Sequence, residues 1–107
     1  MIRLYKLIRE LEKLIDARSE LREIAFKTGA IISACQILIR EHGNQSDIAQ
    51  ILEDITMIAN RMGRVARGAW GSSPFDYEIA VQDVNSMKDF ITQIGKILRI
   101  EFKETQS

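Results

Sequence analysis

The sequence predicts an all-α protein: an antiparallel bundle of three long helices in a single domain, residues 1–107. Apolar residues recur in steps of three and four over almost the whole chain, which is the period of an amphipathic helix. Only residues 42–46 and 68–73 interrupt this pattern. The composition, 46% hydrophobic and 28% charged with a single proline, is that of one small globular domain and leaves few turn residues for a β-sandwich.

The first helix is predicted over about residues 2–42. Its apolar residues form a heptad seam, a stripe in which spacings of three and four alternate so that one face meets a partner helix. The seam consists of Leu4, Leu7, Leu11, Leu14, Arg18, Leu21, Ala25, Thr28, Ile32, Cys35 and Ile39. Because the register does not slip at Gly29, we expect one continuous helix. A break near Gly29, where glycine could form a left-handed cap, is the alternative and would give four helices.

The other two helices are predicted over about residues 47–67 and 74–103. The side chain of Ser46 can accept a free N–H group in the first turn of the second helix. The third helix has the clearest start in the sequence, with Ser73 at the cap and Pro74 at the first helical position. Acids lie early in this helix and bases lie late, which is the order that the helix dipole favours.

Two glycines within the predicted helices indicate a close helix crossing. A hairpin at residues 43–46 places Gly29 level with Arg61 and close to Gly63, and a glycine within a helix costs about 1 kcal/mol relative to alanine. Close approach of the two backbones is the expected reason for both glycines. The same register places Gly95 level with the first loop, where an added side chain finds space. We therefore expect Gly63→Leu to disrupt the bundle far more than Gly95→Leu.

The register also leaves residues 1–18 beyond the end of the second helix, as an overhang of roughly 30 Å. Its apolar stripe cannot remain in water, so the helix must fold back on its own bundle or pack on another chain. Residues 30–39 are apolar on nearly every side, as in a helix with neighbours all round. We therefore expect a coiled-coil-like homodimer in which residues 1–18 are an overhanging oligomerisation helix. The predicted interface residues are Leu4, Leu7, Leu11, Leu14 and Arg18.

Composition argues against several classes of function. A net charge of zero, from 15 Lys+Arg and 15 Asp+Glu, is not that of a protein that coats nucleic acid by bulk charge. A single cysteine and a single histidine make no zinc motif, and we expect neither metal nor cofactor. No apolar run approaches the roughly 20 residues that span a membrane, and the charged N-terminus is not that of a signal peptide. We therefore expect no membrane partner and a cytoplasmic location.

The sequence contains no clear catalytic constellation. Cys35 lies in the most apolar stretch, where a small core residue is expected, and His42 is about 10 Å farther along the helix. The acids considered as Mg²⁺ ligands are Glu20, Glu23, Glu53 and Asp54. They lack the second acid pair at helical spacing that converging carboxylates on two helices require. Mg²⁺-dependent nucleotide hydrolysis is thus a distant third interpretation, and we do not expect an enzyme.

A basic stripe followed by aromatic residues is the feature that points to a partner. The candidate partner-binding residues are Arg61, Arg64, Arg67, Trp70 and Phe75. Arginine and tryptophan are enriched at binding hot spots, so we expect a self-associating protein-protein interaction module, such as an adaptor, a regulator or an inhibitor of a larger assembly. The alternative is a nucleic-acid-associated helical regulator, in which the arginines hold phosphate and Trp70 stacks on a base. A purely structural interpretation pairs the stripe with Glu20 and Glu23 across the hairpin.

Overall fold

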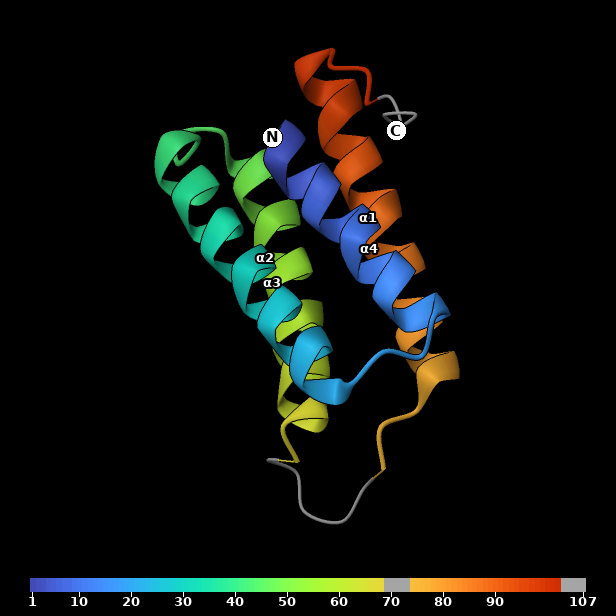
Figure 1. Ribbon diagram of the computed structural model, residues 1–107. Coiled ribbons are helices and arrows are strands. Elements are labelled where there is room, and N and C mark those ends of the chain that lie inside the picture. The colour runs from blue at the N-terminus through green and yellow to red at the C-terminus, as the bar shows by residue number, and fades with distance from the viewer. Residues whose placement is uncertain (69–73, 103–107) are drawn as a thin grey trace.

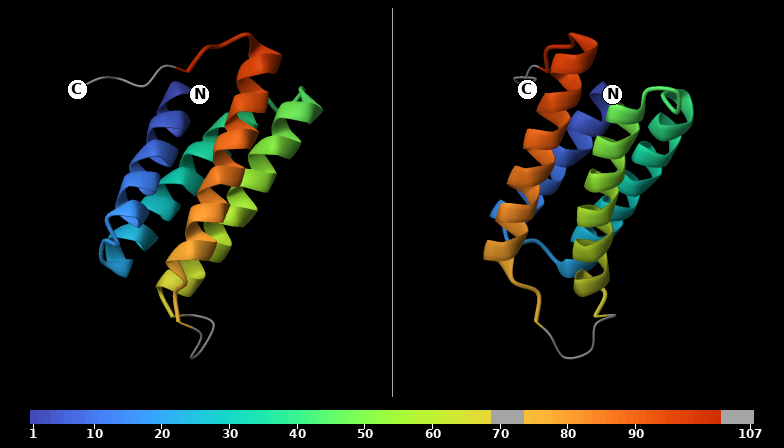
Figure 2. Two further views of the ribbon diagram at one scale, coloured as in Figure 1. Left: turned by 90° about the vertical axis from the view of Figure 1, so that its right-hand side faces the viewer. Right: turned by 180° about the vertical axis from the view of Figure 1, so that it is seen from behind.

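The computed structural model describes residues 1–68 and 74–102, and in them the chain forms four helices in up-down-up-down order (Figure 1). These helices are α1 (Ile2–Asp16), α2 (Leu21–Glu41), α3 (Ser46–Ala66) and α4 (Tyr77–Leu98). Each helix packs on the next one along the chain, and α4 also packs on α1, which closes the bundle (Figure 2). The predicted all-α class and bundle architecture are confirmed.

The predicted single helix over residues 2–42 is in fact two helices, because the chain turns back at residues 17–20. α1 ends in a Schellman motif: the N–H of Ser19 donates to the carbonyl of Leu14 at 2.9 Å. Arg18 occupies the left-handed position of this motif, with a φ of 50°. The predicted count of three helices is therefore wrong.

Neither of the usual sequence signals marks this turn. The left-handed position is most often glycine, but here it is occupied by arginine. The heptad spacing also runs in phase from Leu14 through Arg18 to Leu21, so the periodicity reads as one helix. α2 then continues through Gly29 without a break, as predicted.

α1 folds back on its own bundle, and the expected overhang of residues 1–18 is absent. The side chains of Leu4 and Leu11 have no exposed surface, and Leu7 is also buried. Leu14 is half-buried and Arg18 is exposed. The radius of gyration, 13.6 Å, is close to the value of about 13 Å for a compact chain of this length. A dimer held by this apolar stripe is not confirmed, because one chain buries the stripe by itself.

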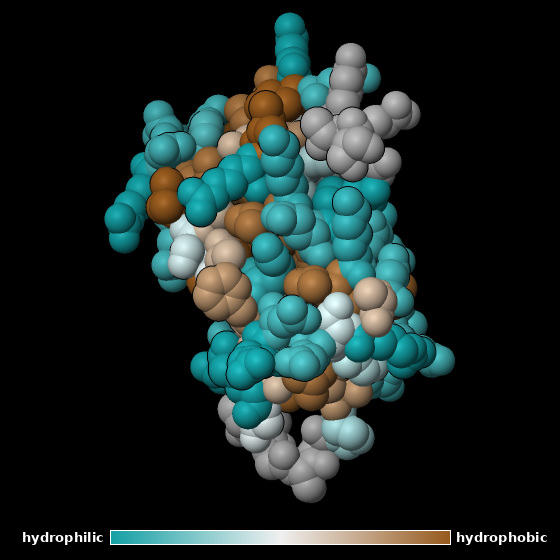
Figure 3. Space-filling model, viewed as in Figure 1, coloured by the Kyte–Doolittle hydropathy of each residue, from teal (hydrophilic) through white to brown (hydrophobic). Residues whose placement is uncertain are grey.

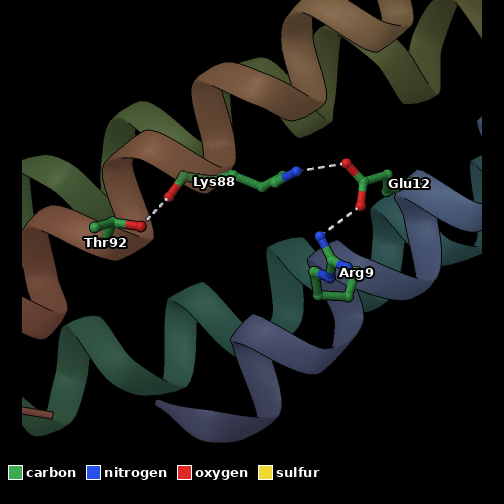
Figure 4. A network of polar contacts seen from close by, with 4 residues as sticks. All are labelled: Arg9, Glu12, Lys88 and Thr92. Carbon is green, nitrogen blue, oxygen red and sulfur yellow. Dashed lines mark hydrogen bonds and ion pairs between the residues drawn. The ribbon is translucent and has the colours of Figure 1, made fainter. Parts of the chain in front are cut away.

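The core consists of large aliphatic side chains from all four helices. Those with the least exposure are Leu4, Ile8, Leu11, Ile15, Ile24, Ile31, Ile48, Leu52, Ile55, Met87, Ile91 and Ile94. One ion pair joins α1 to α4, and a second ion pair within α1 shares its carboxylate (Figure 4). Glu12 accepts a hydrogen bond from Lys88 of α4 at 2.6 Å and pairs with Arg9 of its own helix at 2.7 Å. These three residues hold α1 and α4 together at the surface of the core.

The start of α4 lies three residues later than predicted. Asp76 is the cap, and its carboxylate accepts hydrogen bonds from the backbone N–H groups two and three residues further on, at 2.9 and 3.3 Å. The helix therefore begins at Tyr77 instead of Pro74, and the predicted cap, Ser73, lies outside the described residues. Asp76 satisfies two orphan N–H groups at once, which fixes the start.

The end of α4 comes at Leu98, earlier than the predicted residue 103. Arg99 adopts a left-handed conformation, with a φ of 56°, and the following N–H donates to the carbonyl of Gly95 at 2.8 Å. The chain then returns toward α1, where the ring of Phe102 stacks on that of Tyr5 at a centroid distance of 4.9 Å. Arginine again occupies the position where a glycine would have signalled the turn.

The glycines do not form the predicted crossing. A Cβ atom at Gly63 would lie 2.5 Å from Oγ1 of Thr28, whereas a Cβ at Gly29 would meet nothing within 4 Å. The predicted space at Gly95 is also absent, because a Cβ there would lie 2.8 Å from the ring of Phe102. The register of the α2–α3 hairpin is therefore one residue from the predicted one, and Gly63 faces Thr28.

Candidate partner-binding site

An ion pair joins α3 to α4 within the predicted arginine stripe. The guanidinium of Arg61 donates a hydrogen bond to Oδ1 of Asp83 at 2.8 Å. The Arg61 side chain is 61% exposed, whereas that of Asp83 is only 14% exposed. Burial raises the pKa of the Asp83 carboxyl above its ordinary value, and the charge and hydrogen bond of Arg61 offset only part of that rise. Asp83 is thus a poorly solvated carboxylate with one cationic partner.

An apolar pocket lies beside this ion pair, between the C-terminal half of α3 and the start of α4. Its volume is about 270 Å³. Its uncharged lining residues are Met62, Val65, Pro74, Phe75, Ile79 and Ala80, and its charged ones are Arg61, Asp76 and Asp83. Ligand sites usually enclose about 300–1,000 Å³, so this pocket lies just below that range and has room for one large side chain. It suits an apolar anchor residue of a protein partner.

The three arginines of the stripe do not converge on this pocket. Arg61 lines it, and with Arg64 also lines a wider hollow beside Met57. Arg67 lines a different hollow, between the end of α3 and the exposed Phe26 of α2. The stripe therefore spreads its positive charge around the C-terminal half of α3, an arrangement that suits an extended partner better than one small anion.

The predicted acidic partners of the stripe are not those in the structure. Among the described residues, Glu20 pairs with Arg22 at 3.4 Å, and neither Glu20 nor Glu23 pairs with Arg67. The guanidinium of Arg67 instead lies against its own helix, where a Cβ at Gly63 would meet it at 3.4 Å. The carboxylate that pairs with Arg61 is that of Asp83 in α4. Residue spacing along the predicted hairpin of the first two helices did not reveal this partner.

Phe75 belongs to an aromatic cluster at this end of the bundle. Its ring packs edge-on against that of Tyr77, with the centroids 5.0 Å apart. The Tyr77 hydroxyl donates to the carbonyl of Ser19 at 3.0 Å, and the guanidinium of Arg18 lies 5.0 Å from the Tyr77 ring centroid. Arg18, predicted at an oligomer interface, therefore has a cation–π partner in its own chain. Trp70, the remaining candidate, lies outside the described residues.

Sequence reasoning missed a set of exposed apolar side chains around the stripe. Phe26 is 78% exposed, Met57 is 70% exposed and Ile79 is 54% exposed. Apolar residues also interrupt the hydrophilic surface over α2 in the space-filling view (Figure 3). Each of the three lies off the seam of its helix, and that departure is the signal that could have identified it. Large exposed apolar residues beside arginines are typical of protein-interaction surfaces.

Cys35 and His42 do not form a catalytic pair. Cys35 is fully buried, and burial raises the pKa of its thiol to about 11 despite the opposing effect of a hydrogen bond with Thr56. Nδ1 of His42 lies 3.0 Å from Oε1 of Gln45 at the turn between α2 and α3. Cys35 is therefore a protonated core residue at neutral pH.

Within residues 1–68 and 74–102, no three His, Cys, Asp or Glu side chains gather as metal ligands would. Over the same described residues, no helix has both the length and the apolar character that a membrane crossing needs. No protein-family model, curated protein or solved structure matches the chain. The structure defines an all-α, four-helix domain with an apolar pocket beside an arginine stripe.

The substitution Asp83→Asn is expected to change the pH dependence of stability. Relative to wild type, the free energy of unfolding of the variant should be higher at neutral pH than at acidic pH. Since the pKa of Asp83 is raised on folding, the folded state binds the proton more tightly than the unfolded state. Wild-type stability therefore falls as pH rises from the ordinary aspartate pKa of about 3.9 through the folded value. Because asparagine cannot ionise, the variant does not lose this stability as the pH rises. Urea unfolding of both proteins at pH 3 and pH 7 measures this difference. If the variant is instead less stable relative to wild type at pH 7 than at pH 3, the Arg61 ion pair outweighs the effect of burial on Asp83.

Proposed function

We propose that this chain is a helical protein-interaction module, an adaptor or regulator that binds an acidic segment of another protein. The binding surface is formed by the α3–α4 pocket together with the arginine stripe. An apolar side chain of the partner enters the pocket, and acidic residues on either side meet Arg61, Arg64 and Arg67. The pocket beside the Arg61–Asp83 ion pair is the observation that carries this proposal.

The chemistry of the pocket favours a protein partner over a small metabolite. Its walls are mostly apolar, and its volume of about 270 Å³ lies just below the usual range of small-molecule sites. Interface hot spots commonly consist of such a pocket filled by one anchor residue, with polar groups at the edge that fix its orientation. Ile79 lines the pocket and is also exposed, so it offers apolar contact area to the same partner.

The charge of the surface favours an acidic partner. Arg61 and Arg67 are exposed on α3, and Arg61 retains most of its surface although it pairs with Asp83. Complementary charge accelerates encounter and fixes register more than it adds affinity, so the apolar anchor supplies most of the binding free energy. The proposal does not require self-association, because the apolar stripe of α1 is buried within the chain.

The alternative partner is a nucleic acid, which the same arginines could hold through phosphate contacts. Arg61 and Arg67 line separate hollows, so they do not form one phosphate site. A salt titration separates the two proposals. Binding to phosphates weakens steeply as salt rises, whereas an apolar anchor is far less sensitive to salt.

Selection from a display library of random peptides tests the proposed function directly. We expect the immobilised protein to enrich peptides with one large apolar residue flanked by acids. For an enriched peptide measured by fluorescence anisotropy, Ile79→Asp and Arg61→Ser should each weaken binding at least tenfold. Ile97→Asp is the matched control, because Ile97 is exposed on the same helix, five turns away, and does not line the pocket.

Two outcomes would contradict the proposed function. One is the enrichment of no peptide with this pattern. The other is equal affinity of all three variants for an enriched peptide. Tight binding of an oligonucleotide at low salt that is lost on Arg61→Ala with Arg64→Ala would instead favour the nucleic-acid alternative.

A further inference from the structure

A second cluster of charged residues lines a cleft between α1 and α4, apart from the partner-binding site. The cleft has a volume of about 690 Å³ and receives side chains from both helices and from the chain that follows α4. The lining residues that matter for recognition are Tyr5, Arg9, Lys88, Lys96, Arg99 and Phe102. Unlike the α3–α4 pocket, this cleft falls within the usual size range of small-molecule sites, about 300–1,000 Å³.

Positive charge is concentrated in this cleft although the chain as a whole is neutral. Four lining residues are cationic, and Glu101 is the lining carboxylate. Lys88 and Lys96 lie two turns apart on one face of α4, and Arg9 faces them from α1. A cleft lined by one sign of charge between low-dielectric walls raises the local concentration of ions of opposite sign.

The inner pair of cations is held in place before any ligand arrives. Glu12 accepts from Lys88 at 2.6 Å and pairs with Arg9 at 2.7 Å, so the two side chains approach each other across the helix–helix gap (Figure 4). Thr92 donates to the backbone carbonyl of Lys88 at 2.8 Å. Glu12 neutralises one of these two charges.

The outer pair of cations faces solvent. Lys96 and Arg99 are both exposed, and within residues 1–68 and 74–102 neither of them forms an ion pair with a carboxylate. The stacked rings of Tyr5 and Phe102, inclined by 12°, add a flat aromatic surface to the same cleft. An anion in the cleft would thus meet two cationic side chains that form no ion pair within the described residues, although Glu101 also lines the cleft.

We propose that this cleft binds a small organic phosphate that carries two or more negative charges. Several cations from two helices match a ligand whose charge is spread over neighbouring phosphate groups, and guanidinium groups bind phosphate through paired hydrogen bonds. A ligand with a single carboxylate would match only part of the positive charge that lines the cleft. The volume and the aromatic surface also allow a planar group beside the phosphates, as in a nucleotide.

Thermal unfolding with sodium pyrophosphate and with ATP tests the proposal, with sodium chloride at matched ionic strength as the reference. Both phosphates should raise the melting temperature above the reference, since a ligand that binds only the folded state stabilises it by mass action. By calorimetry, Lys96→Gln with Arg99→Asn should weaken pyrophosphate binding at least tenfold. Asparagine is chosen at position 99 because it tolerates the left-handed conformation there.

The matched control is Lys13→Gln with Arg40→Gln. It removes the same charge from exposed positions that do not line the cleft, and it should leave the affinity within twofold of wild type. Unliganded melting temperatures establish that both variants fold. An equal loss of affinity in the two variants would overturn the proposal, because the binding would then follow net charge alone. Stabilisation by both phosphates no greater than that by sodium chloride would overturn it too.

Discussion

Replacing Leu7 and Leu11 with lysine is expected to unfold the chain. Both leucines are buried between α1 and the rest of the bundle, and Leu11 has no exposed surface. Losing the burial of each side chain costs about 1.5–3 kcal/mol, and an unpaired buried ammonium costs more. Domains of this size are stable by only about 5–15 kcal/mol, so the double variant should lose most of its helical circular dichroism at 25 °C.

The control for this prediction is Ile2→Lys, which introduces one lysine at an exposed position of the same helix. Its effect on the free energy of unfolding should stay within about 0.5 kcal/mol. A double variant that remains fully helical, with half the mass of wild type by light scattering, would contradict the expectation. That result would place these leucines at an interface between two chains, as predicted from the sequence for an overhanging oligomerisation helix.

Gly63→Ala is expected to destabilise the bundle, and removing the Thr28 hydroxyl should reverse that effect. A Cβ at Gly63 would lie 2.5 Å from Oγ1 of Thr28, which donates a hydrogen bond to the carbonyl of Ala25 at 2.7 Å. Overpacking a buried contact of this kind costs typically about 1–3 kcal/mol. In the Thr28→Ala background that oxygen is gone, and alanine should instead gain up to about 1 kcal/mol from helix propensity.

The double-mutant cycle is measured by thermal or urea unfolding, with Gly29→Ala as the matched control. A Cβ at Gly29 meets nothing within 4 Å, so that variant should be as stable as wild type or more stable. A loss of about 1 kcal/mol corresponds to a melting temperature lower by about 4–8 °C in a domain of this size. Equal effects of Gly63→Ala and Gly29→Ala would contradict the register that places Gly63 against Thr28.

The sequence predicted most of the helical content and failed at the turns, for a physical reason. Apolar periodicity follows from burial, so the predicted seam included Leu4, Leu7 and Leu11, which the structure buries in α1. Turn prediction depends on glycine in left-handed positions, and here Arg18 and Arg99 occupy two of them. Gly68, with a φ of 75°, does follow the pattern, and the end of α3 was predicted to within two residues.

The candidate site was predicted in part. The arginine stripe and Phe75 were found from sequence because charge spacing along one helix is visible there. The partner of Arg61 was not found, because Asp83 lies 22 positions away on a helix whose rotation only the packed structure defines. The phosphate cleft was missed for the same reason: Lys96 and Arg99 were read as favourable to the helix dipole, and α1 was not expected to lie beside them.

α1 packs against α4 of its own chain, which completes the core and forms the cleft. Isotope-filtered NOE spectroscopy tests this intrachain packing on an equimolar mixture of labelled and unlabelled protein that has been unfolded and refolded together. The rings of Tyr5 and Phe102, whose centroids lie 4.9 Å apart, should give a strong NOE in the uniformly labelled protein. That NOE should be absent from the filtered spectrum of the mixture. Its presence there would show that α1 is exchanged between two chains and that the bundle is completed only in a dimer.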